Sequence, residues 1–132
     1  MAKPVVLFLC VHNAGRSQMA AAMMERIAGD RVSVTTGGSD PASDVHANVA
    51  EVMGELGVDL STRKPRKFEL ADVEAADVVI TMGCGDECPY VPGKRYEDWQ
   101  VDDPHGKDLD ATRAIRDDIE GRVRALVSSL DI

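Results

Sequence analysis

The sequence predicts an α/β protein with a parallel sheet and helices on both faces of that sheet. Two apolar runs, at residues 5–9 and 77–82, are typical of strands buried on both sides. A β-branched stretch at 32–36 predicts another strand, and a weaker signal at 95–99 predicts a fourth. Segments with helical periodicity separate these strands, and this alternation is typical of a parallel sheet.

Four segments place apolar residues at helical spacing and are predicted to be helices: 18–28, 45–56, 70–76 and 110–130. Ser17 is expected to be the N-cap of the first helix, and Gly29 is expected to end it. Loops are expected where glycine, proline and polar residues gather, at 37–41, 58–69 and 83–92.

The composition is that of a single domain spanning residues 1–132. The formal net charge of −8 argues against nucleic acid or an acidic membrane as the main partner, because both bind basic surfaces. No apolar run approaches the roughly 20 residues that cross a bilayer, so the chain is expected to be cytoplasmic. Three cysteines, an odd number in a reducing compartment, favour catalytic or redox thiols over a disulfide framework. The chain is expected to act as a monomer.

Three chemically active side chains follow the C-terminal ends of predicted strands. Cys10 follows the first strand, Cys84 follows the third, and Asp103 comes after the fourth. Ligands of parallel α/β sheets bind outside these strand ends. The three side chains are therefore expected to face one site.

The segment from Cys10 to Ser17 has the composition of an oxyanion-binding loop that contains a nucleophile. Its backbone N–H groups can turn inward as a nest, and the next helix adds the positive end of its dipole. Arg16 adds a planar fork of donors, and the same field stabilises the thiolate of Cys10. Ser17 can donate a hydrogen bond to the sulfur, and Asn13 tolerates left-handed backbone. The expected oxyanion-binding residues are Val11, His12, Asn13, Ala14, Gly15, Arg16 and Ser17.

Three points stay open at the level of sequence. A buried structural cysteine that happens to precede an arginine is the alternative to a nucleophile, although the flanking strand and helix favour the nucleophile. His12 is either a supporting residue of the site or a solvated loop residue. Trp99, near the fourth strand, either covers the loop or belongs to the core.

The stretch Cys10 to Ser17 resembles the Cys-x5-Arg-Ser loop of low-molecular-weight protein tyrosine phosphatases and of the arsenate reductases built on the same fold. The resemblance covers nearly the whole chain, including Asp103-Pro104 and the C-terminal helix. It implies a four-stranded parallel sheet with flanking helices. It also implies that Asp103 is the general acid for the leaving oxygen. From the residues alone, an aspartate before proline is more typical of a turn.

The remaining thiols, Cys84 and Cys88, allow three interpretations: a zinc site, two inert thiols, or redox partners of Cys10. A zinc site needs about four ligands, and only His46 or His105 could join the two thiols. The family resemblance implies a thioredoxin-linked arsenate reductase. In that reaction Cys84 attacks the arsenylated Cys10 and forms a disulfide with it. Cys88 then attacks Cys84, which frees Cys10 and leaves a disulfide between Cys84 and Cys88. The resemblance implies no bound cofactor, only an external thiol reductant such as thioredoxin.

Some relatives bind potassium near the loop through a glutamate in the first helix and an aspartate further along the chain. Ala21 and Pro65 stand where those carboxylates would fall, so no metal is predicted.

Two other functions are alternatives. A low-molecular-weight tyrosine phosphatase would hydrolyse aryl phosphates through a phosphorylated Cys10, and would need Arg16 and Asp103 but neither other cysteine. Its relatives often have tyrosines after Asp-Pro, whereas residues 105–107 are His-Gly-Lys, which disfavours an aryl substrate. An oxyanion or arsenic sensor would need a DNA-binding element or a partner, and neither the charge nor the helices indicate one.

Overall fold

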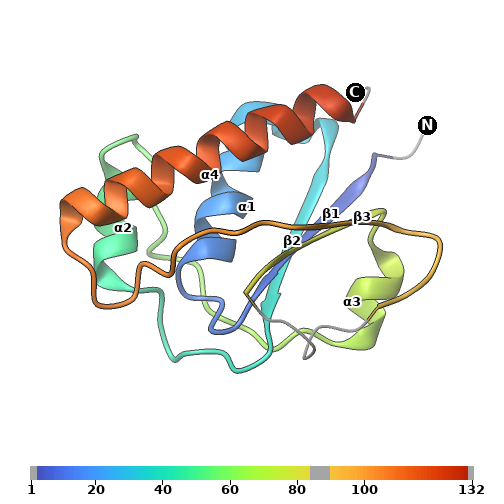
Figure 1. Ribbon diagram of the computed structural model, residues 1–132, viewed down its shortest axis with the longest axis horizontal. Coiled ribbons are helices and arrows are strands. Elements are labelled where there is room, and N and C mark those ends of the chain that lie inside the picture. The colour runs from blue at the N-terminus through green and yellow to red at the C-terminus, as the bar shows by residue number, and fades with distance from the viewer. Residues whose placement is uncertain (1–2, 84–89, 131–132) are drawn as a thin grey trace.

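The computed structural model describes residues 3–83 and 90–130. Within these ranges one sheet has four parallel strands in the order β2-β1-β3-β4, as Figure 1 shows. The strands are β1 (Val5–Cys10), β2 (Ser33–Gly38), β3 (Val78–Met82) and β4 (Arg95–Asp98). The predicted parallel α/β sheet is therefore confirmed.

The helices also lie where the periodicity predicted them, with ends that agree to within two residues. They are α1 (Arg16–Ala28), the short 3-10 helix η1 (Gly29–Arg31), α2 (Ala47–Gly54), α3 (Leu70–Ala75) and α4 (Leu109–Ser129). Of the helices within residues 3–83 and 90–130, none combines the length and the apolar composition needed to cross a membrane.

Helices cover both faces of the sheet (Figure 1). Helices α1, α2 and α4 pack on one face around Phe8, Met53 and Ile119, all fully buried. Helix α3 packs on the other face, where Val73 contacts a smaller cluster that includes Leu7. Both faces of β1 are therefore buried, which explains its unbroken apolar run.

Trp99 belongs to the core. Its side chain is buried in the larger cluster, and its ring centroid lies 5.9 Å from that of Phe8 at an interplanar angle of 55°. The indole N–H donates to a carboxylate oxygen of Glu97 at 3.1 Å, so its polar atom is satisfied.

The predicted N-cap of α1 is wrong. Gly15 caps the helix, whereas Ser17 is the second helical residue and is fully buried. The hydroxyl of Ser17 is engaged with Cys10 and Asn13 instead of with the helix backbone. The predicted stop is confirmed: Gly29 is the C-cap, with φ at 61°.

The predicted loop at 37–41 begins too early, because Gly37 and Gly38 are the last residues of β2. Both glycines permit a close approach that a side chain would block. A Cβ on Gly37 would lie 2.7 Å from the Cβ of Phe68. A Cβ on Gly38 would lie 2.6 Å from the carbonyl oxygen of Val11. Glycine here signals a crowded strand end rather than a turn.

Candidate active site

Cys10 occupies the centre of the C-terminal edge of the sheet. It is the last residue of β1, pairs with Gly38 on one side and Met82 on the other, and is 2% exposed. Its Sγ lies 2.9 Å from the Oγ of Ser17, and the backbone N–H of Asn13 donates to it at 3.3 Å. Asn13 and Ser17 therefore fix the position of the sulfur beside the loop.

Asn13 is a hydrogen-bond partner of the Ser17 hydroxyl. Its side-chain amide donates to the Oγ of Ser17 at 2.7 Å, so that oxygen already accepts a hydrogen bond. The single hydroxyl proton of Ser17 is then free to point at the sulfur of Cys10. Asn13 has φ at 51°, which confirms the expected left-handed backbone, and its Oδ1 accepts from the N–H of Arg66 at 3.0 Å.

Gln18 is a structural residue of the loop that the sequence did not reveal. It is 2% exposed, and its Nε2 donates to the backbone oxygen of Asn13 at 2.9 Å. The sequence shows only a glutamine directly after Ser17, and the carbonyl partner that explains its burial is set by the fold.

The described carbonyl groups of the loop bond either to the 39–46 segment or to α1, and the carbonyl of Asn13 accepts from Gln18 on that helix. Those of Cys10, Val11, His12 and Ala14 accept, respectively, from the backbone N–H groups of Ser39, Asp40, Ala42 and His46, and Gly15 accepts from Met19 within α1. A loop that directs its carbonyls outward turns its N–H groups inward. This is the polarity that an oxyanion nest requires. Oxyanion binding by these residues stays a prediction.

Arg16 is the first residue of α1 and is held between two strand ends. Its side chain is 11% exposed, and one guanidinium nitrogen donates to the carbonyl oxygen of Val101 at 3.4 Å. Gly83, directly after β3, has φ at 86° and packs on the same guanidinium, where an added Cβ would lie 2.6 Å from the nitrogen. Gly83 was not singled out in the sequence, although a glycine at a strand end was a signal.

Asp103 lies beside Arg16, with 3.7 Å between its Oδ2 and a guanidinium nitrogen. Its other oxygen accepts from the backbone N–H of His105 at 3.0 Å. Asp103 therefore makes the hydrogen bond of a turn aspartate and also lies next to Arg16. Its role as the general acid stays a prediction. Its side chain is 45% exposed, as access to a substrate requires.

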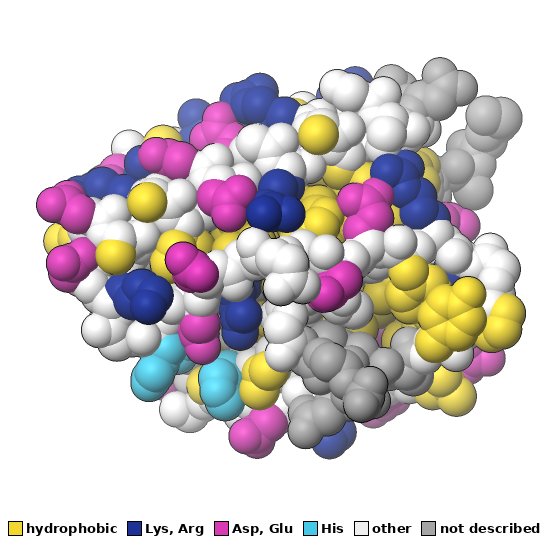
Figure 2. All heavy atoms as spheres, in the orientation of Figure 1, with side chains coloured by type: hydrophobic (Ala, Val, Ile, Leu, Met, Phe, Trp, Pro, Cys, Tyr) yellow, Lys and Arg dark blue, Asp and Glu magenta, His cyan; other side chains and the backbone are white. Residues whose placement is uncertain are grey.

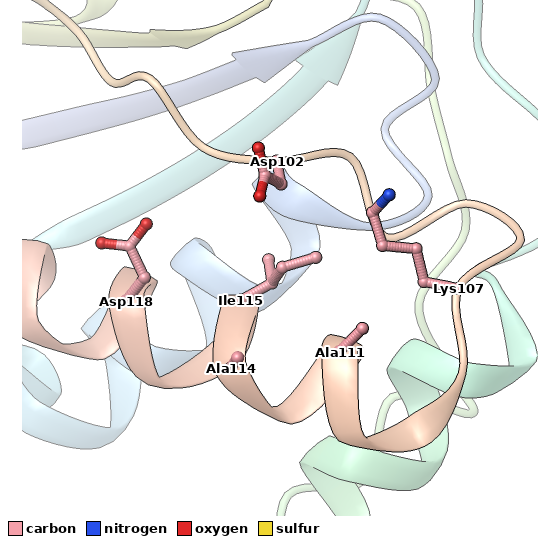
Figure 3. A pocket seen from close by; sticks show the side chains of 6 residues that line it. All are labelled: Asp102, Lys107, Ala111, Ala114, Ile115 and Asp118. Carbon is pink, nitrogen blue, oxygen red and sulfur yellow. The ribbon is translucent and has the colours of Figure 1, made fainter.

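Its neighbour Asp102 belongs to a different surface. Asp102 lines a pocket of about 380 Å³ with Lys107 and with Ala111, Ile115 and other residues of α4, as Figure 3 shows. The geometry therefore singles out Asp103, not Asp102, as the carboxylate next to Arg16.

The three histidines of the chain gather beside the loop. The rings of His46 and His105 are 4.9 Å apart, and Figure 2 shows histidine side chains gathered on one part of the surface. The Nδ1 of His12 lies 2.9 Å from the carbonyl oxygen of Asp40. Burial lowers the pKa of His46, and the charges of His105 and His12 lower it further against the opposing effect of Asp103.

Among the residues that the structure describes, no group of three or more histidine, cysteine, aspartate or glutamate side chains is arranged to hold a metal ion. Ala21, which the family resemblance placed at a potassium-ligand position, is buried in the core at 1% exposure. Cys84 and Cys88 lie outside the described residues, so their predicted roles stay predictions. Gly83, which precedes Cys84 in the sequence, contacts Arg16.

Comparison with known proteins adds three findings. The family model described as low molecular weight phosphotyrosine protein phosphatase matches residues 5–132. A Halobacterium salinarum protein with the provisional name arsenate reductase is 47% identical over 121 residues, which are 88% of this chain and 85% of that protein. The glutaredoxin arsenate reductase of a Synechocystis species is 34% identical over 128 residues, or 95% and 97% of the two chains.

A solved structure has the same fold. The thioredoxin-dependent arsenate reductase of Corynebacterium glutamicum superimposes with a TM-score of 0.86 and 46% sequence identity over 96% of this chain. The present chain spans 61% of the length of that protein.

Proposed function

Because the chain belongs to the low-molecular-weight phosphotyrosine protein phosphatase family, we propose that it is an enzyme that reduces arsenate to arsenite. The observation that carries this proposal is the arrangement at the sheet edge. A thiol with two donors, an arginine and an aspartate surround one loop whose polarity suits an oxyanion. The names of two similar proteins and of one structural neighbour, all arsenate reductases, support arsenate as the oxyanion.

The first step joins sulfur to arsenic. The loop amides and Arg16 hold arsenate, and the thiolate of Cys10 attacks the arsenic atom to form a sulfur–arsenic bond. Asp103 donates a proton to the oxygen that leaves, which departs as water. Arsenic keeps its oxidation state in this step, so no electrons have yet been transferred.

The second step reduces arsenic. The thiolate of Cys84 attacks the sulfur of Cys10, and a disulfide forms as the sulfur–arsenic bond breaks. The electron pair of that bond stays with arsenic, which leaves as arsenite, and two thiols have become one disulfide. Cys88 then attacks Cys84, which frees Cys10 and leaves a disulfide between Cys84 and Cys88.

An external dithiol closes the cycle. We expect thioredoxin for two reasons. The structural neighbour is a thioredoxin-dependent enzyme, and a disulfide between cysteines separated by three residues suits exchange with a dithiol. The Synechocystis relative is named for glutaredoxin, so the two reductants must be compared directly.

The test is multiple turnover with defined reductants. Arsenate, thioredoxin, thioredoxin reductase and NADPH should give continuous NADPH oxidation with the wild-type chain. Cys88→Ser should release about one arsenite per chain and then stop, since its disulfide stays between Cys10 and Cys84. Cys84→Ser should release none.

Peptide mapping provides the control. Each disulfide lowers the mass of the joined peptides by about 2 Da relative to the two thiols, so the pairs can be assigned after arsenate treatment. If Cys88→Ser sustains continuous turnover, the relay is wrong. If only a glutaredoxin system supports turnover, the relay stands and the reductant is wrong.

Hydrolysis of aryl phosphates is the second candidate, because Cys10, Arg16 and Asp103 would also serve a phosphatase and the family model is named for one. Rapid hydrolysis of an aryl phosphate without any reduction of arsenate would favour it. We expect the reverse, because His105 follows Asp103-Pro104 where aryl phosphatases often have a tyrosine.

A further inference from the structure

We propose that Asn48, on α2, is a positioning residue that holds the Asp103 segment against the thiol loop. This inference depends on the proposed role of Asp103 as the acid. Asn48 is 56 positions from Pro104 and 64 from Thr112 in the sequence, and it contacts both.

The side-chain amide of Asn48 is surrounded by acceptors. Its Nδ2 lies 2.8 Å from the carbonyl oxygen of Pro104, 3.0 Å from the Oγ1 of Thr112 and 3.3 Å from the carbonyl oxygen of Lys107. Thr112 is fully buried, and its hydroxyl donates to the carbonyl oxygen of Asp108 at 2.6 Å. Its single proton is thus engaged, so it can only accept from Asn48. The site therefore requires a donor at position 48.

Pro104 links this anchor to the thiol loop. Pro104 is buried, whereas Asp103 and His105 on either side of it are exposed. Its ring packs on Gly15, where an added Cβ would lie 2.7 Å from the Cγ of Pro104. Asn48 therefore holds the carbonyl of the same residue whose ring contacts the loop.

The position of Asp103 follows from that of Pro104. Consecutive Cα atoms are about 3.8 Å apart across a trans peptide, so a movement of Pro104 is passed directly to Asp103. The distance between Asp103 and Arg16 is 3.7 Å, close to the limit of an ion pair. A misplacement of about 1 Å at a reacting group can cost on the order of 100-fold in rate.

Two variants separate this role from general stability. Asn48→Asp keeps the shape of the side chain but replaces the donor with a carboxylate facing three acceptor oxygens. Position 48 is the second residue of α2, where an acidic side chain favours the helix. Val52→Ala is the matched control, because Val52 is fully buried on the same helix and its apolar side chain donates no hydrogen bond, so its truncation destabilises the core without removing the donor of Asn48.

The decisive measurement uses the Asp103→Asn background. Asn48→Asp should lower kcat on arsenate by about 10- to 100-fold and leave KM nearly unchanged, because no residue of the anion loop is replaced. It should have no further effect when Asp103 is already replaced. Val52→Ala should leave kcat within about twofold of wild type.

The same variants should be assayed on phenyl phosphate, whose poor leaving group also needs an acid. If arsenate is not reduced but phenyl phosphate is hydrolysed, arsenate reduction is refuted. The effect of Asn48→Asp with and without Asp103→Asn is then measured on the hydrolysis of phenyl phosphate. Amide hydrogen exchange in residues 103–107 should accelerate in Asn48→Asp and not in Val52→Ala, whatever the substrate.

Three results would overturn the proposal. One is a loss of kcat from Asn48→Asp that is equally large with and without the Asp103 carboxylate. Another is a wild-type rate in Asn48→Asp. The third is unchanged exchange in residues 103–107, which would show that Asn48 does not hold the segment.

Discussion

Gly83→Ala should disable the oxyanion site while leaving the fold intact. The new Cβ would lie 2.6 Å from a guanidinium nitrogen of Arg16. Ordinary contact begins at about 3.4 Å, so the guanidinium must move by about 0.8 Å. The displaced atoms are the end of a flexible side chain, so this movement costs little stability. The guanidinium group of Arg16, however, no longer faces the loop as before.

Two magnitudes follow for this substitution. A non-glycine residue at φ 86° costs about 1–2 kcal/mol in the free energy of unfolding. The displacement of Arg16 should cost about 10- to 100-fold in kcat/KM for arsenate, since it approaches the 1 Å misplacement that costs about 100-fold. A loss of oxyanion affinity should accompany it, measured by competition with inorganic phosphate.

Gly57→Ala is the matched control. Gly57 has φ at 78°, and an added Cβ there would meet nothing within 4 Å. It should lose about the same 1–2 kcal/mol in urea unfolding and keep its kcat/KM. A wild-type kcat/KM for Gly83→Ala, or an equal loss of activity in both variants, would refute the reasoning.

Two further predictions concern the sulfur and the histidines. Ser17→Ala removes the hydroxyl 2.9 Å from the Sγ of Cys10. Iodoacetamide reacts with the thiolate, and a hydrogen bond to a charged group contributes about 1.5–3 kcal/mol, so the variant should slow alkylation of Cys10 at pH 7 by about 10- to 100-fold; an unchanged alkylation rate would contradict it. The pKa of His46 is lowered from 6.5 by burial and by the charge of His105, so the unfolded state takes up a proton at higher pH than the folded state. The contribution of His46 to stability should therefore be complete above about pH 6.5 and decline as the pH falls below it, and urea unfolding between pH 7.5 and 5.5 should be less pH-dependent in His46→Gln. Equal pH dependence in the two proteins would show that the burial of His46 does not contribute to the pH dependence of stability.

The elements of the fold could be predicted because their signals are local. The apolar run of β1 and the periodicity of α4 are properties of neighbouring residues, and both elements appeared within two residues of their expected bounds. The loop from Cys10 to Arg16 was also recognisable, since its spacing between strand and helix is itself the pattern.

Local rules gave the wrong result where a distant partner competes for a group. Ser17 has the side chain of an N-cap, but Cys10 and Asn13 take its hydroxyl and Gly15 caps the helix. Glycine at position 37 is typical of a turn, but Gly37 lies in β2, and Phe68 packs where a side chain would be.

By itself the sequence determined the alternation of strands and helices and the spacing between Cys10 and Arg16, because these are properties of neighbouring residues. The role of Cys10 as the nucleophile stays a prediction. Only the tertiary structure decided that Asp103 rather than Asp102 lies beside Arg16, at 3.7 Å. It likewise decided that Asn48 anchors the Asp103 segment from 56 residues away. Hydrogen bonds and contacts between remote segments depend on which strand ends meet at the sheet edge, and no local pattern of residues records that meeting.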